Sequence, residues 1–254
     1  MTATYRGSRK HVLDWVSRPT FVTELLALCR GFEVRVNRDS RWMPLSYKEP
    51  EEARLEQFGP AWNPLSPTWE ALQDWWLLHR KGANTPNWDI ALGCEILGKP
   101  GLVLVEAKAH ETELDPRGKT PPDPRSEKSK ANHEQIARAI DEARSGYSAT
   151  GHEIQISRDT HYQLSNRLAF MWRLARADIP TVLVYLGFTG DQPIGAGVVP
   201  FRDHEHWAQA FETYSKPVMP RTMIENCLQL GPAPAWLLVR SRPVFEESTR
   251  LEPH

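Results

Sequence analysis

A chain of 254 residues can bury a substantial core, and its 40% hydrophobic and 25% charged residues are typical of an ordinary globular protein. The formal net charge of -1 excludes a protein that coats nucleic acid with its whole surface, so any phosphate site must be a local basic cluster. No apolar run reaches the roughly 20 residues of a membrane helix, and the N-terminus lacks the apolar stretch of a secretory signal. We therefore expect one elaborated domain over residues 1–254, in the cytoplasm and without a membrane partner.

Periodic apolar residues and turn signals predict helices and strands that alternate along the chain. The elements expected in chain order are a helix over 20–30 that ends at Gly31, a helix from Pro67 to about 80, a β-hairpin over 87–110, a helix over 127–145 that stops at Gly146, a helix over 161–178, a buried strand over 181–188 and a last strand over 235–240. Between the hairpin and the helix that follows it, residues 115–130 form a loop rich in proline and basic residues.

The hairpin is the informative segment, because each of its strands alternates between two kinds of face. In the first strand the even-numbered residues from Trp88 to Ile96 are apolar, and in the second the odd-numbered residues from Val103 to Ala109 are apolar. Residues that lie opposite each other in an antiparallel pair point to the same side, so paired numbers must sum to an odd value. This parity places Asp89 on the same face as Glu106 and Lys108.

The exact register of the hairpin depends on its turn. A two-residue turn at Lys99-Pro100 is disfavoured, because such turns need positive φ and proline fixes φ at a negative value. We therefore expect a four-residue loop from Leu97 to Pro100, which pairs Ile96 with Gly101. This register places Asp89 opposite Lys108 and diagonal to Glu106, within reach of one ion and its water.

These three residue types together fit the chemistry of phosphodiester hydrolysis. Two carboxylates on adjacent strands suit Mg²⁺ or Mn²⁺, which leave other coordination positions to water and phosphate oxygens. Lys108 beside them can orient the attacking water and stabilise charge that builds on a phosphate oxygen. Asp89 and Glu106 are thus the expected metal ligands, and Asp89, Glu106 and Lys108 the expected catalytic residues.

Asp89 together with Glu106-Ala107-Lys108 resembles the signature of the PD-(D/E)XK nuclease superfamily, although the literal Pro-Asp dipeptide is absent because Trp88 precedes the aspartate. The resemblance implies an α/β fold with a restriction-endonuclease-like αβββαβ core over about 67–188, a mixed central sheet flanked by helices, and N- and C-terminal elaborations. It also implies a metal-dependent endonuclease that hydrolyses DNA. Cutting both strands with one site per chain favours a homodimer.

The resemblance further implies supporting residues on the helices around the hairpin. A fourth acidic group often comes from the helix before the hairpin, where Glu70 is the natural candidate, with Glu24 behind it. Some relatives use a glutamine on a following helix, and Gln163 and Gln135 are the candidates.

Basic residues of the proline-rich loop supply the local positive charge that the whole chain lacks. The expected nucleic-acid contacts are Arg117, Lys119, Lys128 and Lys130. A loop that is merely solvated is the alternative interpretation.

Two other functions compete with the nuclease. The first is a nucleic-acid-binding or assembly module that keeps the fold without turnover. The second is an unrelated α/β protein whose hairpin face is an exposed ladder of ion pairs.

Overall fold

The structure is a computed structural model that describes residues 5–57, 66–192 and 195–245. Its helices are α1 (Gly7–Val16), α2 (Phe21–Leu28), α3 (Ser66–Trp76), α4 (Glu127–Ala149), α5 (Tyr162–Arg176) and α6 (His204–Ser215). Its strands are β1 (Val34–Arg35), β2 (Trp42–Met43), β3 (Ile90–Ile96), β4 (Lys99–Lys108), β5 (Thr181–Thr189), β6 (Cys227–Leu228) and β7 (Ala235–Pro243). No helix among these is long and apolar enough to cross a membrane.

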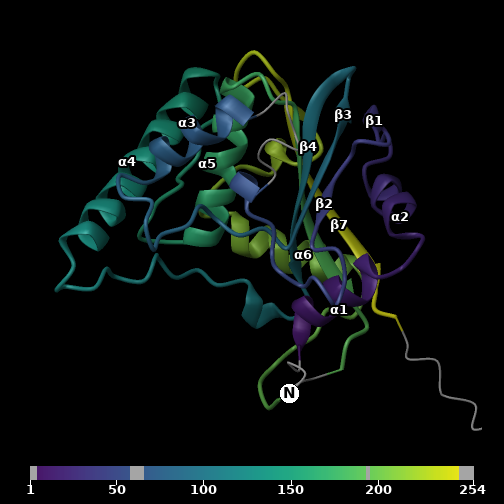
Figure 1. Ribbon diagram of the computed structural model, residues 1–254. Helices are drawn as coiled ribbons and strands as arrows, with labels where there is room; N and C mark the ends of the chain where they lie inside the picture. The colour runs from purple at the N-terminus through teal and green to yellow at the C-terminus, as the bar shows by residue number, and fades with distance from the viewer. Residues whose placement is uncertain (1–4, 58–65, 193–194, 246–254) are drawn as a thin grey trace, which may run out of the picture.

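Within the described residues, seven strands form one mixed sheet with the order β1-β3-β4-β5-β7-β6, and β2 pairs with β3. The hairpin of β3 and β4 is antiparallel, whereas β4, β5 and β7 run parallel to one another. Figure 1 shows the sheet between two layers of helices, with α3, α4 and α5 on one side and α1 and α2 on the other. The expectation of a mixed sheet flanked by helices is confirmed.

Helices cover both faces of the sheet, and each face has its own core. One core joins the sheet to α3, α4, α5 and α6, and the other joins it to α1 and α2. The strand β5 contributes alternate residues to the two cores and is buried along its whole length, as its continuous apolar sequence predicts. The hairpin therefore has no solvent-facing side of the kind that the alternation of polar and apolar residues suggested.

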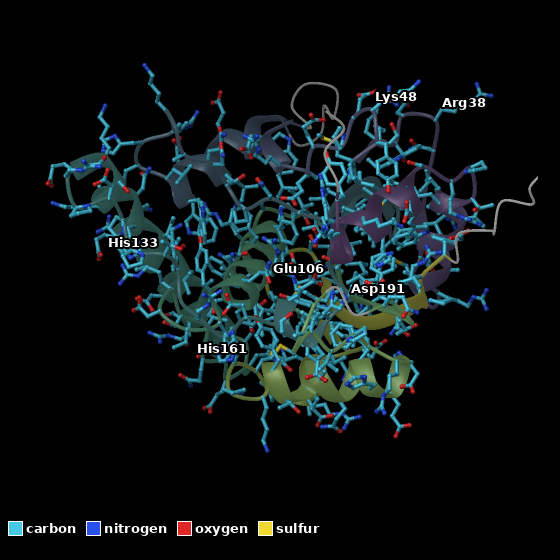
Figure 2. The ribbon with its side chains drawn as sticks, turned by 90° about the horizontal axis from the view of Figure 1, so that it is seen from below. Arg38, Lys48, Glu106, His133, His161 and Asp191 are labelled. Carbon is cyan, nitrogen blue, oxygen red and sulfur yellow. The ribbon has the colours of Figure 1, made fainter. Side chains whose placement is uncertain are left out.

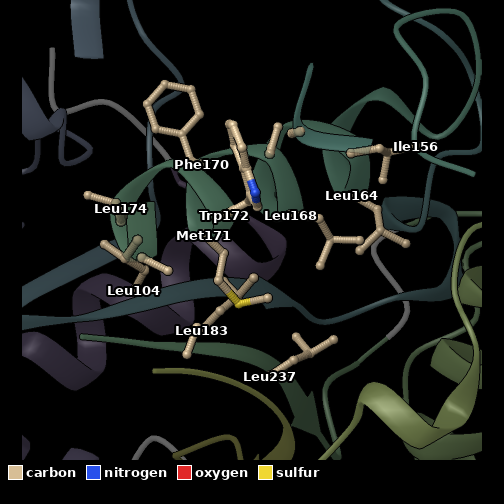
Figure 3. Packing of buried hydrophobic residues seen from close by; sticks show 14 of the residues in the cluster. Leu104, Ile156, Leu164, Leu168, Phe170, Met171, Trp172, Leu174, Leu183 and Leu237 are labelled. Atoms are coloured by element: carbon tan, nitrogen blue, oxygen red, sulfur yellow. The ribbon is translucent and has the colours of Figure 1, made fainter. Parts of the chain in front are cut away.

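The helix α5 is the central element of the larger core. Figure 3 shows Met171 pointing toward Leu183 of β5, while Phe170 and Trp172 point away from the sheet. The Phe170 ring lies 4.9 Å from the ring of Trp76 of α3, in an edge-to-face contact that aromatic pairs favour. Because large apolar side chains each contribute about 1.5–3 kcal/mol when fully buried, this packing holds α5 firmly above β4 and β5.

Gly146 does not end its helix, in contrast to the sequence expectation. The helix α4 continues to Ala149, and Gly146 lies inside it. A Cβ atom added to Gly146 would lie 2.1 Å from Nε1 of Trp172. The glycine is therefore needed for the close approach of α4 to α5, and the sequence alone could not distinguish this role from a helix stop.

The turn of the hairpin also differs from the expectation. Ile96 pairs with Lys99, so the turn consists of Leu97 and Gly98, and the predicted pairing of Ile96 with Gly101 is wrong by two residues. Both turn residues have positive φ, 52° at Leu97 and 75° at Gly98, as a two-residue hairpin turn requires. The two-residue turn that the sequence analysis rejected was Lys99-Pro100, and the sequence gives little sign of a turn at Leu97-Gly98 because leucine seldom adopts a left-handed conformation. The odd parity of the pairing is nevertheless correct.

Candidate active site

Glu106 and Lys108 project from β4 toward α5 and are buried there. Their side chains are only 1% and 6% exposed, and Lys108 Nζ forms an ion pair with Oε1 of Glu106. Figure 2 shows Glu106 near the middle of the molecule. This burial excludes the alternative of an exposed ladder of ion pairs on the hairpin.

Arg167 of α5 is the principal partner of Glu106. Its Nε and Nη2 atoms lie 2.7 and 2.6 Å from Oε2 of Glu106, and its Nη2 also donates to the carbonyl oxygen of Asn87 at 2.5 Å. The guanidinium lies 4.3 Å from the ring centroid of Trp88, within the range of a cation–π contact. Arg167 lies three residues after Leu164, within the apolar stripe of the helix, and this position is the signal in the sequence for its burial.

Asp89 lies at a bend just before β3. The backbone of the preceding residue, Trp88, leaves β4 and pairs with Ala53 instead. The backbone N–H of Ala107 on β4 is then left without a partner on β3, and it donates a hydrogen bond of 2.8 Å to Oδ2 of Asp89 instead. The bend also moves Trp88 to the core under α5, opposite to the side that strict alternation predicted.

The three predicted residues form one electrostatic unit together with Arg167. Burial by itself would raise the pKa of Glu106, but the charges of Arg167 and Lys108 outweigh it and hold that pKa below its ordinary value. Burial would lower the pKa of Lys108, yet Glu106 and Asp89 raise it, so the ammonium stays protonated. Burial and the nearby charge of Glu106 raise the pKa of Asp89 to about 7.

A cavity of about 550 Å³, here called the carboxylate cavity, opens above these residues. Asp89, Glu106, Lys108 and Arg167 all line it. The other residues that line it are Ser8, Arg9, Glu52, Asn87, Thr112, Glu113, Asp115, Arg117, Gly118, Lys119, Thr120, Tyr162 and Gln163. The cavity thus combines a carboxylate floor with several cationic side chains on its walls.

Three further acidic residues of this cavity, Glu52, Glu113 and Asp115, were missed by the sequence analysis. Glu52 is close enough to raise the pKa of Asp89. Glu113, in the short 3₁₀ helix η3 (Glu111–Glu113), accepts hydrogen bonds from the backbone N–H groups of Ala109 at 2.6 Å and Ser8 at 3.2 Å. Glu52 lies in a loop and Glu113 in a single 3₁₀ turn, neither of which has a periodic pattern, so the sequence offered no signal for either.

The helices bring only one of the four proposed supporting residues to the cavity. Gln163 of α5 lines it. Glu70 is exposed on α3 and is not among its lining residues, because its side chain faces away from the core. Gln135 donates to the carbonyl of Trp75 at 2.7 Å and so connects α4 to α3. Glu24 lies across the sheet, where it accepts a hydrogen bond from Arg242.

The four basic residues predicted to contact nucleic acid do not lie together in the structure. Arg117 and Lys119 line the carboxylate cavity, and Lys128 lines a neighbouring cavity. Lys130 lies 2.7 Å from Glu127 in an exposed ion pair and lines neither of these cavities. The first part of the loop is therefore at the candidate site, and Lys130 is not.

Two buried histidines next to the cavity share one carboxylate. Nε2 of His11 on α1 lies 2.8 Å from Oδ2 of Asp191, and Nε2 of His110 lies 3.2 Å from the same oxygen. Both imidazoles are at least nine-tenths buried, and Asp191 follows the end of β5. The sequence separates these residues by about 100 and 80 positions, so no local pattern could reveal the cluster.

The carboxylates fit a cation of the Mg²⁺ type better than a tightly caged transition metal. Among the described residues there is no group of three or more histidine, cysteine or acidic side chains arranged to hold a metal. Mg²⁺ needs only one or two carboxylates, with the remaining positions filled by water and phosphate. Burial raises the pKa of Asp89 and the charge of Glu106 raises it further, and such a cation would relieve the repulsion between the two carboxylates.

Comparison of this chain with protein-family models, with curated protein sequences and with solved structures gives no match.

Proposed function

We propose that this chain is a metal-dependent endonuclease that hydrolyses phosphodiester bonds of DNA. The observation that carries the proposal is the convergence of Asp89, Glu106 and Lys108 at the floor of a cavity lined by cations. The order α3, β3, β4, α4, α5, β5 agrees in part with the αβββαβ core of the PD-(D/E)XK nucleases, since it has one strand fewer before α5 and adds α4. A homodimer stays a prediction.

Asp89 and Glu106 would hold Mg²⁺ or Mn²⁺, which supplies charge neutralisation at the phosphate and lowers the pKa of water. Asp89 is fixed in position by the N–H of Ala107, and Glu106 by Arg167. Because Lys108 is held in its protonated form, it acts as a donor. It stabilises negative charge on a phosphate oxygen and does not remove the proton of the attacking water.

A module that binds nucleic acid without turnover is the second candidate, and one observation favours it. Both oxygens of Glu106 are already engaged, one by Lys108 and the other by Arg167. The charge of this carboxylate is already compensated by the two side chains, so Glu106 needs no metal ion for that purpose. A catalytic Glu106 must therefore share its oxygens between these cations and the metal.

Cleavage assays test the proposal. Supercoiled plasmid and a labelled linear duplex are incubated with the protein in Mg²⁺, Mn²⁺ or EDTA, beside Asp89→Asn, Glu106→Gln and Lys108→Met. The matched controls are Glu95→Gln on β3 and Lys99→Met at the other end of β4, where Lys99 lies 2.9 Å from Asp178.

We expect cutting that requires the metal, is lost in the three site variants and is retained in both controls. Binding without cutting in all proteins would favour the second candidate. Cutting that persists in EDTA or in the three site variants would contradict the assignment of the site.

A further inference from the structure

Lys119 is a half-buried cation without an acidic partner. Its ammonium lies 5.0 Å from the ring centroid of Tyr162, and no carboxylate within the described part of the chain forms an ion pair with it. Burial lowers the pKa of this lysine, and no negative charge offsets the effect. A cation that has lost part of its hydration without gaining an anion is expected where an anionic ligand binds.

The backbone around Lys119 is held in place by a second segment. The N–H of Lys119 donates to the carbonyl of Arg158 at 2.8 Å, and Arg117 pairs with Thr160 in an isolated bridge. Between them, a Cβ atom on Gly118 would lie 2.4 Å from the carbonyl oxygen of Asp159, so only glycine permits this close approach. Lys119 is thus presented by an ordered backbone, which reduces the entropic cost of binding a ligand.

Lys119 also stands where two cavities meet. Lys119 and Thr120 line both the carboxylate cavity and a second cavity of about 490 Å³, here called the α4 cavity. The two cavities are therefore neighbours that share Lys119 and Thr120 in their walls, and together they are here called the groove. His133 of α4, labelled in Figure 2, lines the α4 cavity.

The charge of the groove changes along its length. The carboxylate cavity contains several acidic side chains, as described above, whereas the α4 cavity is lined by Lys81, Lys119 and Lys128. The acidic residue that lines the α4 cavity is Asp123, which lies 3.2 Å from Arg125 in an ion pair. Of these two cavities, the α4 cavity is the one whose lysines outnumber its acidic side chains, so an anionic polymer would meet an excess of positive charge there.

We propose that a single strand of nucleic acid leaves the carboxylate cavity past Lys119 and continues through the α4 cavity, with its phosphates contacting Lys119 and Lys128. This inference rests on the proposed function and adds the path of the substrate strand. Cavities of several hundred Å³ have the size of small-ligand sites, so they accept successive nucleotides of one strand rather than a whole duplex. The substrate next to the cut phosphate is therefore single-stranded or locally opened.

Equilibrium binding in EDTA tests the path separately from hydrolysis. A fluorescein-labelled 12-nucleotide single strand and the corresponding duplex are titrated with wild type, Lys119→Gln, Lys128→Gln and the control Lys216→Gln, and fluorescence anisotropy is measured over a range of salt concentrations. Lys216 is exposed after the end of α6 and lines neither cavity. Thermal unfolding verifies that each variant is folded.

We expect wild type to bind the single strand more tightly than the duplex. Lys119→Gln and Lys128→Gln should each weaken single-strand binding several-fold and reduce the slope of log affinity against log salt by about 0.7, whereas Lys216→Gln should change neither. Equal binding by all four proteins, or no binding by wild type, would overturn the path whatever the cleavage assay gives. Weakened binding in the two groove variants without any DNA cutting would retain the path and refute hydrolysis.

Discussion

Replacing Arg167 by methionine tests whether the ion-pair network holds the candidate site together. The substitution removes the guanidinium that lies 2.6 Å from Oε2 of Glu106 and leaves a carboxylate that is 1% exposed with Lys108 as its remaining ion-pair partner. Removing one partner of a buried ion pair costs about 3–5 kcal/mol, because the remaining charge stays desolvated. The lost hydrogen bond to the carbonyl of Asn87 acts in the same direction.

Urea unfolding, followed by tryptophan fluorescence and by circular dichroism, measures the change in the free energy of unfolding. We expect Arg167→Met to lose about 3–5 kcal/mol and Arg176→Met, exposed at the end of the same helix, to change by less than about 0.5 kcal/mol. In the double variant with Glu106→Gln, part of the loss should be recovered, giving a coupling energy of about 1–3 kcal/mol. A loss below about 1 kcal/mol for Arg167→Met, or purely additive effects, would refute the description of Glu106 as a buried charge that depends on Arg167.

Three further substitutions test particular features of the fold by the same unfolding measurement. Gly146→Ala should destabilise the protein by about 1–3 kcal/mol despite the higher helix propensity of alanine, because the new Cβ would overlap Trp172; unchanged stability would contradict the close packing of α4 and α5. Asp191→Ala should cost about 1–3 kcal/mol, since two buried histidines lose the carboxylate oxygen that lies 2.8 and 3.2 Å from their Nε2 atoms, and a neutral result would show that the histidines do not depend on it. Leu97→Asn should stabilise the hairpin by about 1 kcal/mol, because asparagine tolerates positive φ better than leucine; a loss of stability would contradict the turn.

The grouping of Asp89, Glu106 and Lys108 could be predicted from the apolar alternation of the two strands, although Asp89 lies at a bend just before β3 and its neighbour Trp88 breaks the alternation. The predicted register was wrong by two residues, yet a shift of two leaves every side chain on the same face. Had the error been one residue, Asp89 would have been placed on the opposite face from Glu106. The apolar pattern therefore predicted the face on which each side chain lies more reliably than the turn residues predicted which residues pair.

The surroundings of these residues could not be predicted, because they depend on contacts between distant segments. Arg167 reaches Glu106 across 61 positions of the chain, and Glu52 reaches the cavity from a loop. Alternation indicated a polar face on the hairpin, but it could not reveal that α5 covers that face. Glu70 was expected at the site from the resemblance alone, and α3 presents it to solvent instead.

The most direct test of the central claim is the initial rate of DNA cutting as a function of Mg²⁺ concentration, for wild type, Glu106→Gln and Glu95→Gln. The account predicts that cutting by wild type rises with Mg²⁺ and saturates, that Glu95→Gln follows the same curve, and that Glu106→Gln is slower by about 100-fold or more at every concentration. Cutting by Glu106→Gln at the wild-type rate, or no metal-dependent cutting by wild type, would contradict it.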